Sequence, residues 1–177
     1  MYEERASAYF RLKQYDQCLK DCAKALYGSE GSISAHMTQA KALSALGRHE
    51  EAARGLHSLL SLDQSNSQIR SQYEKTIFEM KRQKRPDYYA ILKIGKVTSQ
   101  VEIRAAYKQR ALELHPDRVP PDQREEAEKL FKLLQEALDI LSDDMKRDLY
   151  DKGYDKEAIQ ERIEAAHRAA NKGGHHH

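Results

Sequence analysis

The chain has 177 residues, of which 40% are apolar and 33% are charged. This balance excludes a disordered chain, and no stretch reaches the roughly 18–20 consecutive apolar residues that a membrane span needs. The formal net charge of +2 excludes a strong overall attraction to polyanions. All four prolines lie at positions 86–121, so the long stretches on either side are free to be helical. We therefore expect an all-α fold.

A pattern of small and large apolar residues recurs after 34 residues in the first half of the chain. Ala6 and Cys18 are followed at this interval by Ala40 and Ala52. The helices of a helix–turn–helix unit approach closely where such small side chains meet, and Gly47 would occupy the turn with a positive φ. The pattern resembles the tetratricopeptide repeat (TPR), whose period is 34 residues. The usual proline at the end of each repeat is replaced by Glu30 and Gln64.

Cys18 and Cys22 lie four residues apart, which places them on one face of a helix. Two thiols with no further ligands nearby make neither a disulfide framework nor a zinc site. We expect buried structural thiols, and we predict neither a metal nor a cofactor for this protein.

A further helix is predicted over residues 67–84, where it would close the repeat stack. Because Met1 already lies inside the first repeat, we interpret the chain as a piece of a longer repeat protein. The resemblance implies a concave groove that could hold acidic tails of heat-shock chaperones, but only one of its positions is basic. These positions are Glu3, Ser7, Thr38, Lys41, Gln68 and Gln72. We expect a scaffold here, with a second chaperone or client bound, if at all, by repeats upstream.

The basic run Lys81–Arg85 precedes Pro86, which we take as the domain boundary. Cations are favourable at the C-terminus of a helix, so we interpret the run as a solvated helix end. Nucleic-acid binding is the weaker alternative, because no aromatic residues alternate with the charges. We predict no nucleic-acid partner and no membrane partner.

Two long helices are predicted in the second module. Asp87 is expected to cap a short helix, and Ser99 with Glu102 forms a capping box that opens a helix to about Leu114. A second helix is expected over residues 124–141, and the two would pair as an antiparallel hairpin. Their expected buried faces are Ile103, Ala106, Tyr107, Ala111 and Leu114 on the first, and Ala127, Leu130, Phe131, Leu134, Ala137, Leu138 and Leu141 on the second.

The tripeptide His115-Pro116-Asp117 lies in the connection between these helices. The proline fixes φ and would present Asp117 rigidly. Arg104, Lys108 and His115 are spaced by four and seven residues, which places them within about 40° on one helical face. No nucleophile or ligand set accompanies the histidine, so we predict a docking surface and not an enzyme. The alternative is that the tripeptide only turns the chain beside a solvated face.

Four motifs resemble the J domain of DnaJ-type co-chaperones, over residues 86–152. They are Asp87-Tyr88-Tyr89-x-Ile91-Leu92, Glu102-Ile103-Arg104-x-Ala106-Tyr107, the tripeptide, and Leu141-Ser142-Asp143 with Lys146-Arg147 and Tyr150-Asp151. The resemblance implies docking on a DnaK-type heat-shock chaperone and stimulation of its ATP hydrolysis. It assigns docking to Arg104, Tyr107 and Lys108. It assigns the trigger to His115, Pro116 and Asp117, with Arg118 in the same binding set.

The chain departs from the J-domain pattern at four positions. Ala105 and Gln109 stand where basic residues are frequent, Lys93 where glycine is usual, and Leu114 where an aromatic residue is common. The first two departures predict weaker docking. None of the four alters the tripeptide.

The layout of repeats followed by a J domain is similar to that of cytosolic TPR-and-J co-chaperones. We therefore expect a cytoplasmic and also nuclear location, with the endoplasmic-reticulum lumen as the alternative. The rival function is a passive interaction scaffold whose J domain does not signal. The predicted divisions are residues 1–85 for the repeats, 86–152 for the J domain, 153–172 for a charged helix that docks on the J domain or extends into solvent, and 173–177 for a vector tail.

Overall fold

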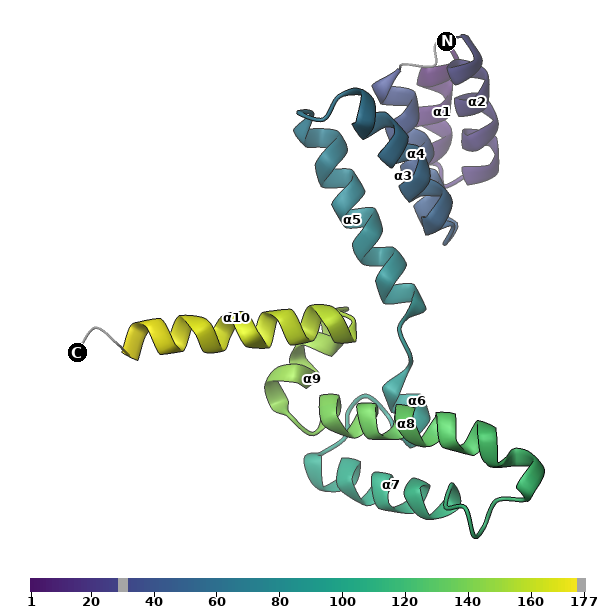
Figure 1. The fold of residues 1–177 in the computed structure, drawn as a ribbon. Helices are drawn as coiled ribbons and strands as arrows, with labels where there is room; N and C mark the ends of the chain where they lie inside the picture. Colours follow the sequence, from purple (N-terminus) through teal and green to yellow (C-terminus); the bar gives the residue numbers. More distant parts are fainter. Residues whose placement is uncertain (29–31, 175–177) are drawn as a thin grey trace. The chain divides into compact units, whose positions relative to one another are not determined.

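The computed structural model describes residues 1–28 and 32–174 (Figure 1). These residues form α-helices and one short 3-10 helix without a β-strand, which confirms the predicted all-α class. No helix in the described ranges is long and apolar enough to cross a membrane. The chain divides into two compact units, Met1–Gln83 and Lys84–His177.

The first unit is built from helical hairpins (Figure 1). Helix α1 (Tyr2–Arg11) packs on α2 (Tyr15–Gly28), and α3 (Ile33–Ala45) packs on α4 (His49–Leu62). Contacts of α3 with both α1 and α2 join the two hairpins. Helix α5 (Ser67–Lys84) follows, with the bounds that the sequence predicts. This is the arrangement expected of TPR units.

Small side chains lie where the helices of the first unit meet. Ala6, Cys18, Ala40 and Ala52 are all buried, as the 34-residue pattern predicts. Gly47 has φ +78° in the second turn. The thiols of Cys18 and Cys22 are buried, and burial raises the pKa of Cys22 to about 12. They are therefore inert packing groups.

The turns of the two hairpins share one backbone conformation. Lys13, which lies 34 residues before Gly47, has φ +60°. Left-handed backbone is unfavourable for residues with a Cβ atom, so the first turn carries strain that the second avoids.

An ion pair between an exposed arginine and a buried aspartate links α1 to α2. Asp21 is only 2% exposed, and the Arg5 guanidinium donates from Nε to Oδ2 over 2.7 Å and from Nη2 to Oδ1 over 2.8 Å. These hydrogen bonds lower the pKa of the Asp21 carboxyl. The sequence does not predict this pair, because nothing in a 16-residue separation identifies the partner.

The second unit is a helical hairpin with short helices and a long C-terminal helix around it (Figure 1). Its elements are α6 (Tyr88–Leu92), α7 (Gln100–Glu113), η1 (Pro121–Gln123), α8 (Arg124–Leu141), α9 (Asp144–Asp151) and α10 (Lys156–Gly174). Both predicted N-caps are confirmed: Asp87 accepts from the Ala90 amide and Ser99 from the Glu102 amide, each over 3.2 Å.

The core of the second unit lies between α6, α7, α8, α9 and the first half of α10. Ile103, Leu134, Ala137 and Leu141 are buried there as predicted. Leu130 is 40% exposed, so its assignment to the buried face was wrong. Ile140 is buried instead, because the core wraps around the C-terminal half of α8, where the short helices also pack.

Helix α10 both docks and extends. Ile159 and Ile163 belong to the core, while Ala166 and Ala170 are exposed. Lys156 Nζ also pairs with Glu136 on α8 over 3.1 Å. The helix continues through Gly174, and the rest of the predicted tail, residues 175–177, lies outside the described residues. Residue Glu30 of the predicted repeat end lies outside them as well.

Candidate functional site

The tripeptide forms a tight turn directly after α7. The helix ends at Glu113, and the amide of His115 donates to the carbonyl of Leu112 over 3.3 Å. The amide of Arg118 then donates to the carbonyl of His115 over 2.9 Å. These bonds, with the fixed φ of Pro116, define the backbone at the tip of the hairpin.

The Asp117 carboxylate projects into solvent at this tip. Its side chain is 90% exposed, and its Oδ2 lies 3.6 Å from Nδ1 of His115. The Asp117 amide donates to Nδ1 of His115 over 3.2 Å. An imidazole nitrogen that accepts carries no proton, so this bond selects the neutral ring protonated at Nε2. The carboxylate is thus held by its backbone while remaining accessible to a partner.

Two cations lie on the exposed side of α7. Arg104 and Lys108 are exposed, and neither forms an ion pair within the part of the chain that the structure describes. His115 was predicted to share this face with Arg104 and Lys108. It lies beyond the helix, because α7 ends two residues before it, so the helical spacing does not apply there. Arg118 is exposed in the turn, beyond the helix.

Two further residues of α7 are used for packing. Tyr107 is half-buried against the core, so only part of its ring is available for the predicted docking role. Arg110 donates to the carbonyl of Ile91 over 3.1 Å and pairs with Glu113 over 2.6 Å, which lowers the pKa of that carboxyl. Arg110 therefore attaches α7 to α6 and is not a free cation.

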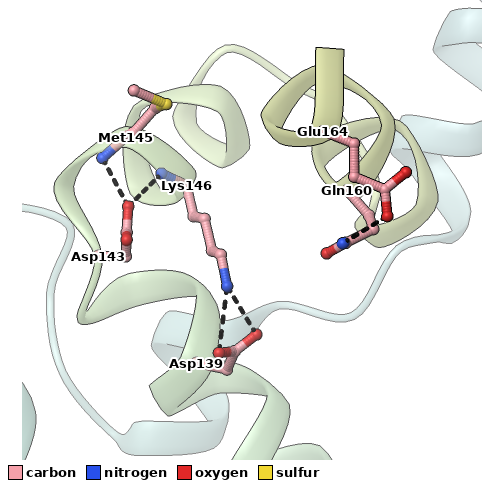
Figure 2. A network of polar contacts seen from close by, with 6 residues as sticks. All are labelled: Asp139, Asp143, Met145, Lys146, Gln160 and Glu164. Carbon is pink, nitrogen blue, oxygen red and sulfur yellow. Dashed lines mark hydrogen bonds and ion pairs between the residues drawn. The ribbon is translucent and has the colours of Figure 1, made fainter. Parts of the chain in front are cut away.

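The motif residues around α9 have structural roles. Figure 2 shows Asp143 accepting from the amides of Met145 and Lys146, each over 3.0 Å, which caps the helix. Lys146 Nζ reaches back to both carboxylate oxygens of Asp139 on α8, over 3.2 and 3.3 Å. These contacts fix the turn between α8 and α9.

The remaining motif residues join α9 to α6. Arg147 donates to the hydroxyl of Tyr89 over 3.1 Å, and that hydroxyl donates to Asp151 over 2.6 Å. Tyr150 donates to the carbonyl of Pro86 over 2.8 Å. The motifs thus separate into a structural set around α6 and α9 and an exposed set at the tripeptide.

One residue of the basic run is built into the second unit. The Arg85 guanidinium lies 3.9 Å from the centre of the Tyr150 ring and donates to the carbonyls of Tyr150 and Tyr154. The interpretation of Lys81–Arg85 as a solvated helix end is therefore wrong for Arg85. A signal was present, since Arg85 is the residue immediately before the proline that opens the second unit.

The first unit has a groove of about 960 Å³ between α3 and α5. Its walls include Thr38, Lys41, Gln68 and Gln72, so four of the six predicted groove positions come together. Glu3 does not line it and instead accepts from the hydroxyl of Ser32. Hydroxyl and amide groups dominate this groove, with Lys41 as the one cation among its lining residues.

Comparison with known proteins confirms the resemblance that the motifs indicate. Residues 87–151 match the DnaJ domain family. The chain is 37% identical over 157 residues, 89% of its length, to a DnaJ homolog subfamily C member 7 homolog of Schizosaccharomyces pombe. It is 33% identical over 158 residues, 88% of its length, to DnaJ homolog subfamily C member 7 of Homo sapiens.

These two alignments extend through the repeats as well as the second unit, and they cover 33% and 32% of the relatives. The chain therefore spans about a third of the length of these proteins. A third relative, the chaperone protein DnaJ of Thermotoga neapolitana, is 53% identical over 76 residues, which is 42% of this chain and 20% of that protein.

Proposed function

Because residues 87–151 belong to the DnaJ domain family, we propose that this chain is a co-chaperone that binds a DnaK-type heat-shock chaperone and stimulates its ATP hydrolysis. The observation that carries the proposal is the Asp117 carboxylate, which is 90% exposed in the turn that follows α7, the helix that carries the exposed cations Arg104 and Lys108. No group on this chain needs to react, because the chaperone holds the ATP and performs the chemistry.

The electrostatics of α7 support docking on an acidic surface. Arg104 and Lys108 are free to pair with a partner, whereas the cation of Arg110 is already occupied by Glu113. Exposed charges of this kind mainly raise the association rate and orient the encounter. Asp117 would then meet a cation of the chaperone at a position set by the turn.

Stimulation of a partner requires different affinities for its two states. A contact accelerates hydrolysis only if it is stronger in the hydrolysis-competent conformation of the chaperone than in the other one. A rigid carboxylate suits this role, because a small displacement of the partner's cation changes the contact sharply. We propose that His115 and Pro116 hold Asp117 for this purpose.

The repeats would serve as a protein-interaction scaffold. The groove between α3 and α5 has a single cation, so it does not favour an acidic tail. We propose that the first unit presents the J domain near other proteins, including clients or a second chaperone bound elsewhere in the longer protein.

Single-turnover ATP hydrolysis by a DnaK-type chaperone, with and without this chain, tests the proposal. We expect a faster rate with the chain, and an unchanged rate would support the passive scaffold instead. Arg104→Glu should weaken the stimulation and reduce its dependence on salt, because exposed charges are screened by ions. Lys129→Glu, the same reversal of charge at an exposed lysine of α8, is the control and should behave like the parent.

A further inference from the structure

A charged cluster of Lys93, Arg110 and Glu113 connects the last turn of α7 to the end of α6. The Arg110 side chain is only 15% exposed, and Nη1 of its guanidinium lies 2.6 Å from Oε2 of Glu113. Nζ of Lys93 lies 3.6 Å from the same carboxylate oxygen. A charge that is largely removed from water needs such partners, because an unpaired one is costly to bury. The cluster is therefore a fixed part of the second unit, unlike the exposed Arg104 on the same helix.

The end of α6 depends on this cluster for one of its hydrogen bonds. The carbonyl of Ile91, in the last turn of α6, accepts from Nε of Arg110 over 3.1 Å. Carbonyl groups at the end of a helix lack an amide partner within the helix, so a side-chain donor is needed there. The backbone then turns at Lys93, whose φ is +58°. Left-handed backbone is unfavourable for a residue with a Cβ atom, yet a lysine at this position supplies a cation to Glu113.

The backbone of Arg110 also belongs to the turn that leads into the tripeptide. Helix α7 ends at Glu113, and the amide of Leu114 donates to the carbonyl of Arg110 over 3.0 Å. The side chain of Arg110 therefore holds α6, while its carbonyl holds the residue that precedes His115. Asp117 is 90% exposed and has little packing of its own. Its place consequently depends on the helix end from which the turn emerges.

We propose that Arg110 is a positioning residue for Asp117. By fixing the last turn of α7 against α6, it sets the place and the direction in which the tripeptide leaves the helix. The inference rests on the proposed function, and it gives a role in stimulation to a residue outside the predicted docking set. A contact that depends on exact geometry is only as precise as the residues that support it.

Separating the size of the stimulation from the affinity tests this inference. Arg110→Met keeps the unbranched apolar stem of the side chain and removes every donor. When the chain is titrated against a DnaK-type chaperone, we expect Arg110→Met to lower the maximal ATPase stimulation about fivefold, the effect of one lost hydrogen bond. The concentration of chain at half-maximal stimulation should stay unchanged, because the exposed cations of α7 remain.

Two further substitutions of a cation by methionine calibrate this titration. Arg104→Met should raise the concentration at half-maximal stimulation and keep the maximum, and Lys129→Met on α8 should behave like the parent. If Arg110→Met instead raised this concentration and kept the maximum, Arg110 would be a docking residue, and the inference would be overturned. Unchanged values of both quantities in Arg110→Met would overturn it as well.

Solvent exchange of backbone amides, measured by NMR on the chain alone, tests the positioning without the chaperone. We expect the amides of residues 115–118 to exchange about fivefold faster in Arg110→Met, while the core amide of Ile103 keeps its rate. Faster exchange throughout the second unit would mean that Arg110 only stabilises the fold, and an unchanged rate at residues 115–118 would also overturn the inference. A parent chain that did not stimulate the chaperone would overturn the proposed function and leave this exchange result unaffected.

Glu113→Gln decides the question if Arg110→Met does not fold. The Glu113 side chain is 36% exposed, so its neutralisation leaves the core intact. Because Arg110 keeps its bond to Ile91 in this variant, we expect the same changes in maximal stimulation and in amide exchange, but smaller ones. Parent values for both would overturn the inference.

Discussion

The backbone amide of Asp117 donates to Nδ1 of His115 over 3.2 Å, so the histidine holds the residue whose carboxylate is exposed. The bond requires a neutral imidazole with its proton on Nε2. The nitrogen chemical shifts of His115 at neutral pH should therefore show this tautomer. The reverse tautomer would contradict the hydrogen bond.

Removing the imidazole should loosen the turn without unfolding the domain. We expect His115→Ala to lower stimulation of the chaperone ATPase about fivefold, because a neutral hydrogen bond contributes about 1 kcal/mol. The thermal midpoint should fall by no more than a few degrees, since the His115 side chain is 55% exposed and the lost bond contributes about 1 kcal/mol. His167→Ala on the exposed part of α10 is the control for loss of a histidine. Full stimulation by His115→Ala would show that Asp117 needs no such support.

The two repeat turns predict opposite effects of adding and removing a Cβ atom. Lys13→Gly should stabilise the first unit by about 0.5–1 kcal/mol, because relief of about 1–2 kcal/mol of left-handed strain exceeds the entropy cost of glycine. Gly47→Ala should destabilise it by about 1–2 kcal/mol, since φ is +78° there. Thermal unfolding measures both. If Lys13→Gly and Gly47→Ala changed the thermal midpoint in the same direction, the two turns would not share one backbone conformation.

The Arg5–Asp21 pair predicts a dependence of stability on acid. The pKa of Asp21 is lowered in the folded state, so its stabilising contribution is fully present above its ordinary value of 3.8 and is lost as the pH falls through the lower folded pKa. Arg5→Met leaves a buried carboxylate unpaired and should lower the thermal midpoint of the first unit by several degrees at pH 7.

The difference in thermal midpoint between the parent and Arg5→Met should become smaller as the pH falls, because protonation of Asp21 removes the unpaired charge. Arg11→Met, at an exposed arginine of the same helix, is the control. A difference that stays constant over this range would mean that the ion pair does not stabilise the fold.

Helix α10 should behave as part of the second unit. Ile159 is 1% exposed in the core, so Ile159→Ala should destabilise the unit by about 2–5 kcal/mol. Glu161→Ala, two residues on at an exposed position, should have little effect. The denaturant midpoint, followed by a spectroscopic probe in α8, measures the effect of each substitution on the second unit. Equal midpoints would show that the helix is only appended to the J domain.

Local patterns predicted the elements well. The bounds of α5 and α8 and the caps at Asp87 and Ser99 follow from helical periodicity and from side chains that bond backbone amides a few residues away. Both signals relate residues that are three or four positions apart, so they can be recognised from the local sequence. The 34-residue pattern likewise predicted which small residues would be buried.

The failures involve contacts that the sequence does not specify. Arg85 and Asp21 look like ordinary surface charges until the fold brings Tyr150 and Arg5 to them. Periodicity placed His115 on the face of α7, because it cannot show that the helix ends at Glu113. The exposure of Asp117 likewise depends on how the hairpin closes.

The most direct test of the central claim is single-turnover ATP hydrolysis by a DnaK-type chaperone with Asp117→Asn, compared with Asp122→Asn in the same loop. Both aspartates are exposed, so neither change should affect folding. We predict that Asp117→Asn loses the stimulation while keeping the parent's thermal midpoint, and that Asp122→Asn stimulates like the parent. Stimulation that survives Asp117→Asn would contradict the proposed mechanism.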